Sequence, residues 1–143
     1  MESKEQPKLF FEGVDVTKVR FTSMRPSREK SINIHVGCKP RVFFPENDKM
    51  CFRIIMDIKL YAEEYFDLEL RAIGNFRFGE VIADESLKKN FVNINAPAIM
   101  FPYVRSFVTT LTASTGNAVG ALIIPPQFFD GPLEEIKIER TVQ

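Results

Sequence analysis

The chain has 143 residues, 45% of them hydrophobic, with nineteen acidic and nineteen basic side chains. Its length suits a single domain spanning 1–143, which should bury roughly 70% of the surface of the unfolded chain. Zero net charge supplies no overall field for nucleic acid, so we expect no nucleic-acid partner.

Two alternating segments come first. Apolar and polar residues alternate over 9–22, but the phase slips near Thr17 and Lys18, which predicts a strand with a bulge. The next alternation predicts a second strand and consists of Ile32, Ile34 and Val36.

The clearest alternation covers 50–62, and 66–72 repeats it, so we expect a hairpin centred near Glu63. One face carries Phe52, Ile54, Met56, Ile58 and Leu60, and the other carries Arg53, Asp57 and Lys59. The expected pairs are Leu60 with Phe66, Ile58 with Leu68, and Met56 with Leu70. Asp57 would then face Glu69, with Lys59 and Arg71 beside them, which favours a solvated ion-paired face over a catalytic carboxylate pair. Four such strands argue for an antiparallel sheet covered on one side.

Cys38 and Cys51 flank the expected hairpin loop at 45–48 and would not lie opposite each other. We therefore expect two free thiols in a reducing compartment.

Helices should follow the strands. Asp84 can cap a short helix that runs through Phe91, and Pro97 suits the first turn of a longer helix ending at Gly116. Pro102 lies within the longer helix and should kink it or delay its start. One apolar stripe is expected along it, at Met100, Val104, Phe107, Val108 and Leu111.

Residues 91–129 contain a single charged side chain, Arg105. A membrane span is one explanation for such a stretch, but its Ser, Thr, Gly and Pro residues argue against a continuous apolar helix. The first residues lack the apolar core of a signal peptide, so we expect a soluble, cytoplasmic protein. A helix without charge on any face should be buried on more than one side. We expect a subunit interface at Val104, Phe107, Val108 and Leu111; the alternative is that the chain's own 116–129 loop covers this helix.

Groups for catalysis are sparse. His35, the single histidine, falls on the polar side of its strand, and no metal-ligand spacing or phosphate-binding loop occurs. We therefore expect no enzyme activity, no metal and no cofactor.

Two short elements resemble the SecB family of export chaperones. Residues 98–105 read AIMFPYVR, and 125–130 read PPQFFD. The matching positions are Phe101, Pro102, Tyr103 and Arg105, then Pro126, Phe129 and Asp130. Arg105 is expected to be a buried structural donor. The resemblance covers about 9–133.

The resemblance implies an α+β fold, with a four-stranded antiparallel sheet and both a long helix and a short terminal helix packed on one face. It also implies assembly through the helices into a dimer of dimers, a homotetramer. The implied function is that of a holdase, which keeps unfolded preproteins competent for Sec-dependent export and approaches the membrane only through the export machinery. The implied client-binding residues are Ile32, Ile34 and Val36 on the strand, Met24 on the crossover, and Leu133 and Ile136 on a helical lid. The strand residues could equally be ordinary core, and the two roles are compatible.

Contact with the SecA motor is a further implication, and Glu69 matches a motor-facing position. The neutral chain, with Lys18, Arg20 and Thr22 on the first strand, departs from the acidic family pattern. Gly131 and Pro132 precede a short, charged terminal helix expected over 133–140. Three functions stay open: an export chaperone, a SecB-like holdase for a dedicated client such as an antitoxin, and a non-chaperone oligomeric scaffold.

Overall fold

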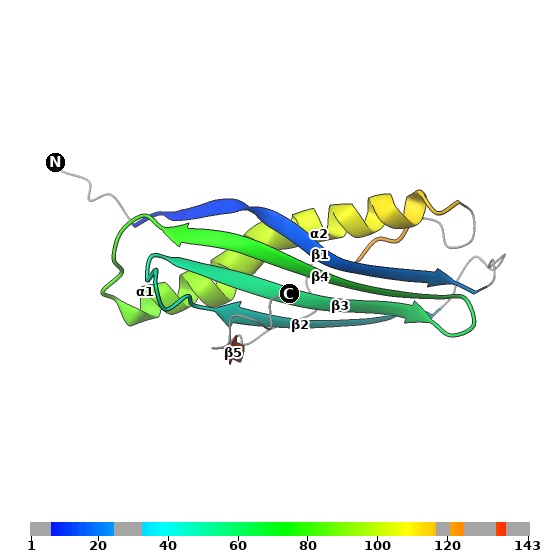
Figure 1. The fold of residues 1–143 in the computed structure, drawn as a ribbon, viewed down its shortest axis with the longest axis horizontal. Helices are drawn as coiled ribbons and strands as arrows, with labels where there is room; N and C mark the ends of the chain where they lie inside the picture. Colours follow the sequence, from blue (N-terminus) through cyan, green and yellow to red (C-terminus); the bar gives the residue numbers. More distant parts are fainter. Residues whose placement is uncertain (1–6, 25–32, 117–120, 125–133, 137–143) are drawn as a thin grey trace.

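The computed structural model describes residues 7–24, 33–116, 121–124 and 134–136. Within these ranges, five strands form one sheet in the order β1-β4-β3-β2-β5 (Figure 1). The strands are β1 (Leu9–Ser23), β2 (His35–Phe43), β3 (Cys51–Ala62), β4 (Phe66–Phe78) and β5 (Glu134–Ile136). Between β4 and β5 come α1 (Glu85–Asn90), the π-helical turn η1 (Phe91–Asn95) and α2 (Ala96–Ala113).

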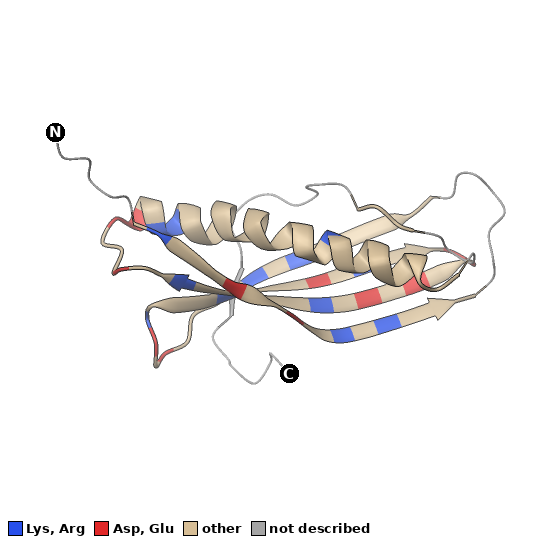
Figure 2. Ribbon diagram, turned by 90° about the horizontal axis from the view of Figure 1, so that it is seen from above, with Lys and Arg blue, Asp and Glu red and all other residues tan. Residues whose placement is uncertain are grey.

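The first four strands are antiparallel, and α2 lies across one face of their sheet (Figures 1 and 2). We call this side the helix face and the other side the open face. The predicted alternation of β3 is confirmed, because its apolar side chains are buried on the helix face. They are Phe52, Ile54, Met56, Ile58 and Leu60. Arg53, Asp57 and Lys59 alternate with them and so lie on the open face; Figure 2 marks the positions of charged residues along the strands.

β1 follows β4 with two irregularities. The pairing shifts between Val16 and Lys18, which confirms the bulge predicted there, and again between Phe11 and Val14. The second shift contains Gly13, whose φ of 103° is a conformation that glycine adopts without strain. The bulges keep Phe11, Val14 and Val19 on the helix face.

The β3–β4 hairpin differs from the prediction by two residues. Leu60 pairs with Leu68 rather than Phe66, and Ala62 pairs with Phe66. The turn therefore contains three residues, of which Glu64 has a positive φ of 72°, and the Tyr65 N–H donates to the Ala62 carbonyl oxygen at 3.0 Å. A shift of two residues leaves every side chain on its face, so alternation alone cannot distinguish the two registers.

As a result, Asp57 faces Arg71 and Lys59 faces Glu69, not the carboxylate pairing that the predicted register required. The expected ion-paired face is nevertheless present. Cys38 pairs with Ile58 in the ladder and Cys51 with Arg77, so the two cysteines do not lie opposite each other, as expected, and both thiols are free.

The helices begin as predicted. The Asp84 carboxylate accepts from the Ser86 and Leu87 backbone N–H groups, at 2.9 and 3.3 Å, and so caps α1. α2 has Pro97 in its first turn and begins well before Pro102, so this proline does not delay its start. The side chains of α2 that are buried towards the sheet include Met100, Val104, Val108 and Thr112. Their spacing of four residues aligns them along one side of the helix.

The predicted terminal helix over 133–140 is wrong where the structure describes it. Glu134–Ile136 is a short strand, β5, parallel to β2 and paired with Arg41–Phe43. The edge of β2 offers backbone groups that need partners, and Glu134–Ile136 supplies them.

The open face also has a small apolar cluster, formed by Phe43, Ile55 and Ile73, whose side chains are 0–4% exposed. Ile55 and Ile73 lie directly opposite each other on β3 and β4. Among the described residues, no helix combines the length and apolarity that crossing a membrane requires.

Candidate functional site

A row of half-buried apolar side chains lies along the start of β2 on the helix face. Val36 and Cys38 are opposite Leu60 and Ile58 of β3, and Ile34 precedes the strand. All three pack against the core and still keep part of their surface exposed. We call Ile34, Val36 and Cys38 the β2 row. The sequence prediction named the first two and missed Cys38, although its spacing of two from Val36 would have included it.

The outer edge of β2 beside this row is open in the part of the chain that the structure describes. β5 pairs with Arg41–Phe43, and no described strand pairs with 35–40 on that side. An unpaired strand edge presents backbone donors and acceptors, and alternate side chains offer apolar contacts. An added strand of extended polypeptide uses both. Pro40 has no N–H to contribute, so the useful edge is His35–Lys39.

The other predicted client-binding residues do not all join this row. The Met24 N–H donates to the Tyr65 carbonyl oxygen at 2.8 Å, which places Met24 beside the β3–β4 turn, with its side chain 55% exposed. Ile34 lies at the same end of the sheet, but β4 and β3 separate the two. Ile32 and Leu133 lie outside the described residues.

Ile136 belongs to β5 and pairs with Phe43, at the opposite end of β2 from Val36. Seven residues of strand separate those positions, or about 23 Å at 3.3 Å per residue. Within the described residues, Ile136 is therefore part of the sheet edge and not of a helical lid over the β2 row.

A short extended segment, residues 121–124, is tied to α2, and we call it the strap. Thr109 Oγ1 donates to the Leu122 carbonyl oxygen at 2.7 Å, and the Leu122 N–H donates to Thr112 Oγ1 at 2.9 Å. Arg105 Nε donates to the Ile124 carbonyl oxygen at 2.9 Å. Leu122 and Ile124 are buried in the core, whereas Ile123 is 77% exposed.

Arg105 is thus a donor that holds the strap, and it is half-buried, whereas a buried position was expected. Of the other matched positions, Phe101 is buried at 3% exposure, while Pro102 and Tyr103 are exposed. The Tyr103 ring lies 5.0 Å from the ring of Phe11, which anchors α2 to β1. Pro126, Phe129 and Asp130 lie outside the described residues.

Two of the four residues predicted at a subunit interface have almost no surface left for one. Val104 and Val108 are 1% and 0% exposed, because they pack on the sheet of their own chain. Phe107 and Leu111 are half-buried against the same core. Larger exposed apolar surface occurs nearby on β1, where Val16 and Val19 face the helix side at 36% and 44% exposure.

The open face is ionic. Asp57 accepts from Arg71 and from Arg41, each with a shortest distance of 2.6 Å. Glu69 lies 3.7–3.9 Å from three cations, which are Lys18, Arg20 and Lys59. Glu69 is therefore on the face predicted for it, but cations surround it.

Nothing in this arrangement prepares a nucleophile. Burial, with a smaller contribution from the Asp57 charge, raises the pKa of the Cys38 thiol from 9.0 to about 12, so it stays protonated near neutral pH. The His35 ring stacks on Tyr61 at 4.7 Å between ring centres. Among the described residues, no group of three or more His, Cys, Asp or Glu could hold a metal ion. The geometry suits binding of extended chains.

The family model for SecB, described as preprotein translocase subunit SecB, matches residues 9–130. The chain belongs to the SecB family. The match begins at the first residue of β1 and covers the four antiparallel strands and α2. It also includes both short elements on which the resemblance was based.

An uncharacterized protein of Methanocaldococcus jannaschii is 28% identical over 150 residues, covering 99% of this chain and 94% of the relative. Among solved structures, a Mycobacterium tuberculosis SecB-like chaperone, in complex with a peptide from the HigA1 antitoxin, superposes with a TM-score of 0.66. That match covers 82% of this chain and 90% of the other at 15% identity. At such identity the likeness concerns the fold.

Proposed function

We propose that this SecB family protein is a holdase, which binds unfolded polypeptide segments along β2 and keeps them from aggregating. The observation that carries the proposal is the β2 row beside the open edge at His35–Lys39. Backbone hydrogen bonds to an added strand tolerate any client sequence, and the row supplies apolar contact at alternate positions. Neither feature requires a nucleotide or a cofactor.

One such site should bind weakly. Burying two or three client side chains gains about 3–9 kcal/mol gross, and ordering an unfolded segment offsets much of it. Most strands of a folded protein are already paired on both sides and its edge strands are short or protected, so the weak site favours unfolded chains.

We further propose that copies associate through the α2 side of the molecule, as a dimer of dimers. Val16, Val19 and Tyr103 support this, because they expose apolar surface on β1 and α2. Phe107 and Leu111 can contribute the part of their surface that their own core leaves uncovered. Several β2 rows in one assembly would raise avidity by about 10² to 10⁴ for a client long enough to reach them.

The comparisons support two candidate client classes. The family's description as a preprotein translocase subunit supports unfolded preproteins held in the cytoplasm for Sec-dependent export. A dedicated client is the second candidate, supported by the fold shared with a SecB-like chaperone that carries an antitoxin peptide. SecA binding by the purified protein, measured by calorimetry, separates them: binding supports export, and none supports the dedicated client.

Suppression of aggregation tests the holdase function. The full chain is added to a chemically unfolded model client upon dilution, and light scattering is followed against the ratio of the two proteins. We expect suppression near stoichiometric ratios and a clear loss of it in Ile34→Asp, because a charge in the β2 row opposes apolar contact. Val81→Asp is the matched control, since Val81 is 81% exposed and lies outside the row.

If the wild-type chain does not suppress aggregation, the scaffold alternative is favoured and the holdase is rejected. Equal suppression by both variants, with circular dichroism showing native folds, would remove the β2 row from the site.

Assembly has its own test. Multi-angle light scattering of Val19→Asp should give a smaller mass than wild type and than Val81→Asp, because Val19 is 44% exposed on the proposed interface. An unchanged mass would exclude this surface.

A further inference from the structure

Two neighbouring rungs of the sheet, each a row of paired residues across β2, β3, β4 and β1, carry charge on the open face. In register order, one rung is Lys39, Asp57, Arg71 and Lys18, and the next is Gly37, Lys59, Glu69 and Arg20. We call these eight residues the basic patch. It holds five cations and two carboxylates, an excess of three positive charges in a chain whose net charge is zero. The adjoining rungs add Asp67 on one side and, on the other, Arg41 and Asp15 together with Glu134, which pairs with Arg41 from β5.

The cations of the patch compete for too few carboxylates. Glu69 is shared by three of them, none closer than 3.7 Å. Asp57 is occupied by Arg71 and by Arg41 from the adjoining rung. Lys39 faces Asp57 in the register, but among the described residues Asp57 forms its ion pairs with Arg41 and Arg71 and not with Lys39.

The register adds a repulsive contact. Lys18 lies directly opposite Arg71, and like charges at opposed positions of neighbouring strands destabilise a sheet. An anion placed between the two would relieve this repulsion. The patch is therefore short of negative charge at its β1 end, at Lys18, and at its β2 end, at Lys39.

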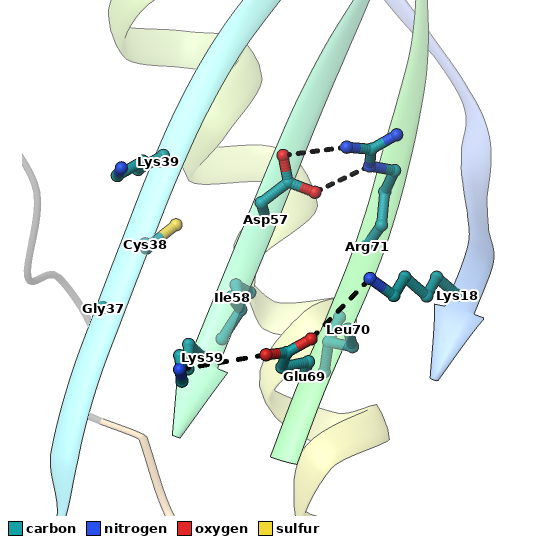
Figure 3. Close-up of a pocket in the computed structure, with 10 residues that line it drawn as sticks. All are labelled: Lys18, Gly37, Cys38, Lys39, Asp57, Ile58, Lys59, Glu69, Leu70 and Arg71. Carbon is teal, nitrogen blue, oxygen red and sulfur yellow. Dashed lines mark hydrogen bonds and ion pairs between the residues drawn. The ribbon is translucent and has the colours of Figure 1, made fainter. Parts of the chain in front are cut away.

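The patch is also hollowed. Seven of its eight residues line a depression of about 490 Å³, and Figure 3 shows their side chains on strands β2, β3, β4 and β1, with the helix behind the sheet. Gly37 leaves room at the β2 end, because a Cβ there would meet no atom within 4 Å. Between the rims formed by Lys39 and Lys18, the floor of this depression has space for the main chain of a bound peptide.

We propose that the basic patch is a docking site for an acidic segment of a partner protein, on the face opposite α2. Lysine and arginine bind carboxylates through charge-assisted hydrogen bonds, and the guanidinium of Arg71 adds planar donors. Asp57 and Glu69 fit a peptide better than a nucleic acid. A peptide backbone brings N–H groups that these carboxylates can accept from, whereas a phosphodiester backbone has acceptors only and would be repelled.

The size of the patch sets the length of the segment. Four strands at about 4.8 Å spacing place Lys18 and Lys39 about 14 Å apart, which an extended peptide crosses in roughly four or five residues. Two or more carboxylates within that length could reach both rims. Because the lysines are exposed, the binding should be weak and sensitive to salt.

Fluorescence anisotropy with a labelled peptide of alternating Glu and Gly tests this site on the full chain. A Gln and Gly peptide is the uncharged probe, and titrations are compared at about 20 mM and about 200 mM NaCl. We expect the Glu peptide alone to bind, and more weakly at the higher salt. Lys18→Glu with Lys39→Glu should weaken binding about ten- to thirtyfold, since two surface attractions become repulsions.

The control is Lys49→Glu with Lys89→Glu, which changes net charge equally at two exposed lysines outside the patch. If both double variants weaken binding equally, or if the Glu peptide does not bind, the docking site is refuted. Tighter binding of a short oligothymidylate than of the Glu peptide would refute the partner class. Lys18→Gln with Lys39→Gln replaces the first variant if its circular dichroism is not native, and should still weaken binding severalfold. The single variant Lys18→Glu should weaken binding of the Glu peptide and leave aggregation suppression unchanged, because Lys18 lies on β1, away from the β2 edge; this keeps the test separate from the holdase function.

Discussion

The hydroxyl of Thr112 offers the sharpest test of how α2 holds the strap. Thr112 is fully buried, donates to the Val108 carbonyl oxygen at 2.8 Å and accepts from the Leu122 N–H at 2.9 Å. Thr112→Val keeps the shape and the β-branch but removes that acceptor, so the buried Leu122 N–H loses its partner. Such a loss costs about 1–3 kcal/mol, and the added methyl returns about 0.8 kcal/mol. We expect a net destabilisation of about 0.2–2 kcal/mol, with a mid-range value of about 1 kcal/mol.

Urea unfolding followed by circular dichroism, at one fixed protein concentration, measures this difference. With an m-value of about 2 kcal/mol/M, the midpoint should fall by about 0.1–1 M, or about 0.5 M for the mid-range value. The Leu122 amide should also exchange with deuterium faster, because opening of the strap becomes easier. Thr110→Val is the control on the same helix, since Thr110 is exposed, and it should stay within about 0.5 kcal/mol of wild type.

Thr109→Val completes the design, because Thr109 donates to the carbonyl of the same Leu122. If losing one bond frees the strap, the double variant should cost less than the sum of the single variants. A Thr112→Val protein as stable as the Thr110→Val control would refute the reasoning, and would mean that the strap contributes no buried hydrogen bond to the fold.

Two further predictions concern packing and proton binding. A Cβ at Gly74 would lie 2.7 Å from the Met100 sulfur, so Gly74→Ala should lower the free energy of unfolding by about 1–3 kcal/mol, measured by urea unfolding. Gly37→Ala is the control and should leave it unchanged, because a Cβ there would meet open space. Equal effects of the two substitutions would contradict this packing. Because the pKa of the Cys38 thiol is raised to about 12, its alkylation at pH 8 should be about 10³-fold slower than in the urea-unfolded chain. Between about pH 9 and pH 12 the folded chain keeps this proton while the unfolded chain releases it, so the free energy of unfolding should fall as pH rises through that range. The fall should be smaller in Cys38→Ala, which lacks the thiol. Equal alkylation rates of the folded and unfolded chains would contradict the burial of Cys38.

The hairpin shows how far alternation can be taken. It assigned every side chain of β3 to the correct face, yet predicted the pairing two residues away from the observed register. The free energy of burial is nearly the same in either register, because the apolar residues recur every second position on both strands. The three-residue turn at 63–65 decided between them, and no glycine marked its positive φ in the sequence.

The candidate site divides in the same way. Ile34 and Val36 could be named from their alternation. They are half-buried, which suits both roles considered for them, as part of the core and as part of a client-binding surface. The open edge beside them could not be foreseen, because it depends on where β5 ends its pairing with β2. The family resemblance implied a helix over 133–140, whereas Glu134–Ile136 forms a strand because the edge of β2 supplies a pairing partner.

The features that depend on neighbours along the chain could be predicted from the sequence. They are the faces of the strands, the Asp84 cap, the β1 bulge and the lack of charge around Arg105. Tertiary structure decided what depends on distant partners. It buried Val104 and Val108 within their own chain, gave Arg105 the carbonyl of Ile124, and brought Lys18 and Lys39 to the two rims of one hollow. Charge excess on one face of a neutral chain is a property of strand order and register, and composition averages it away.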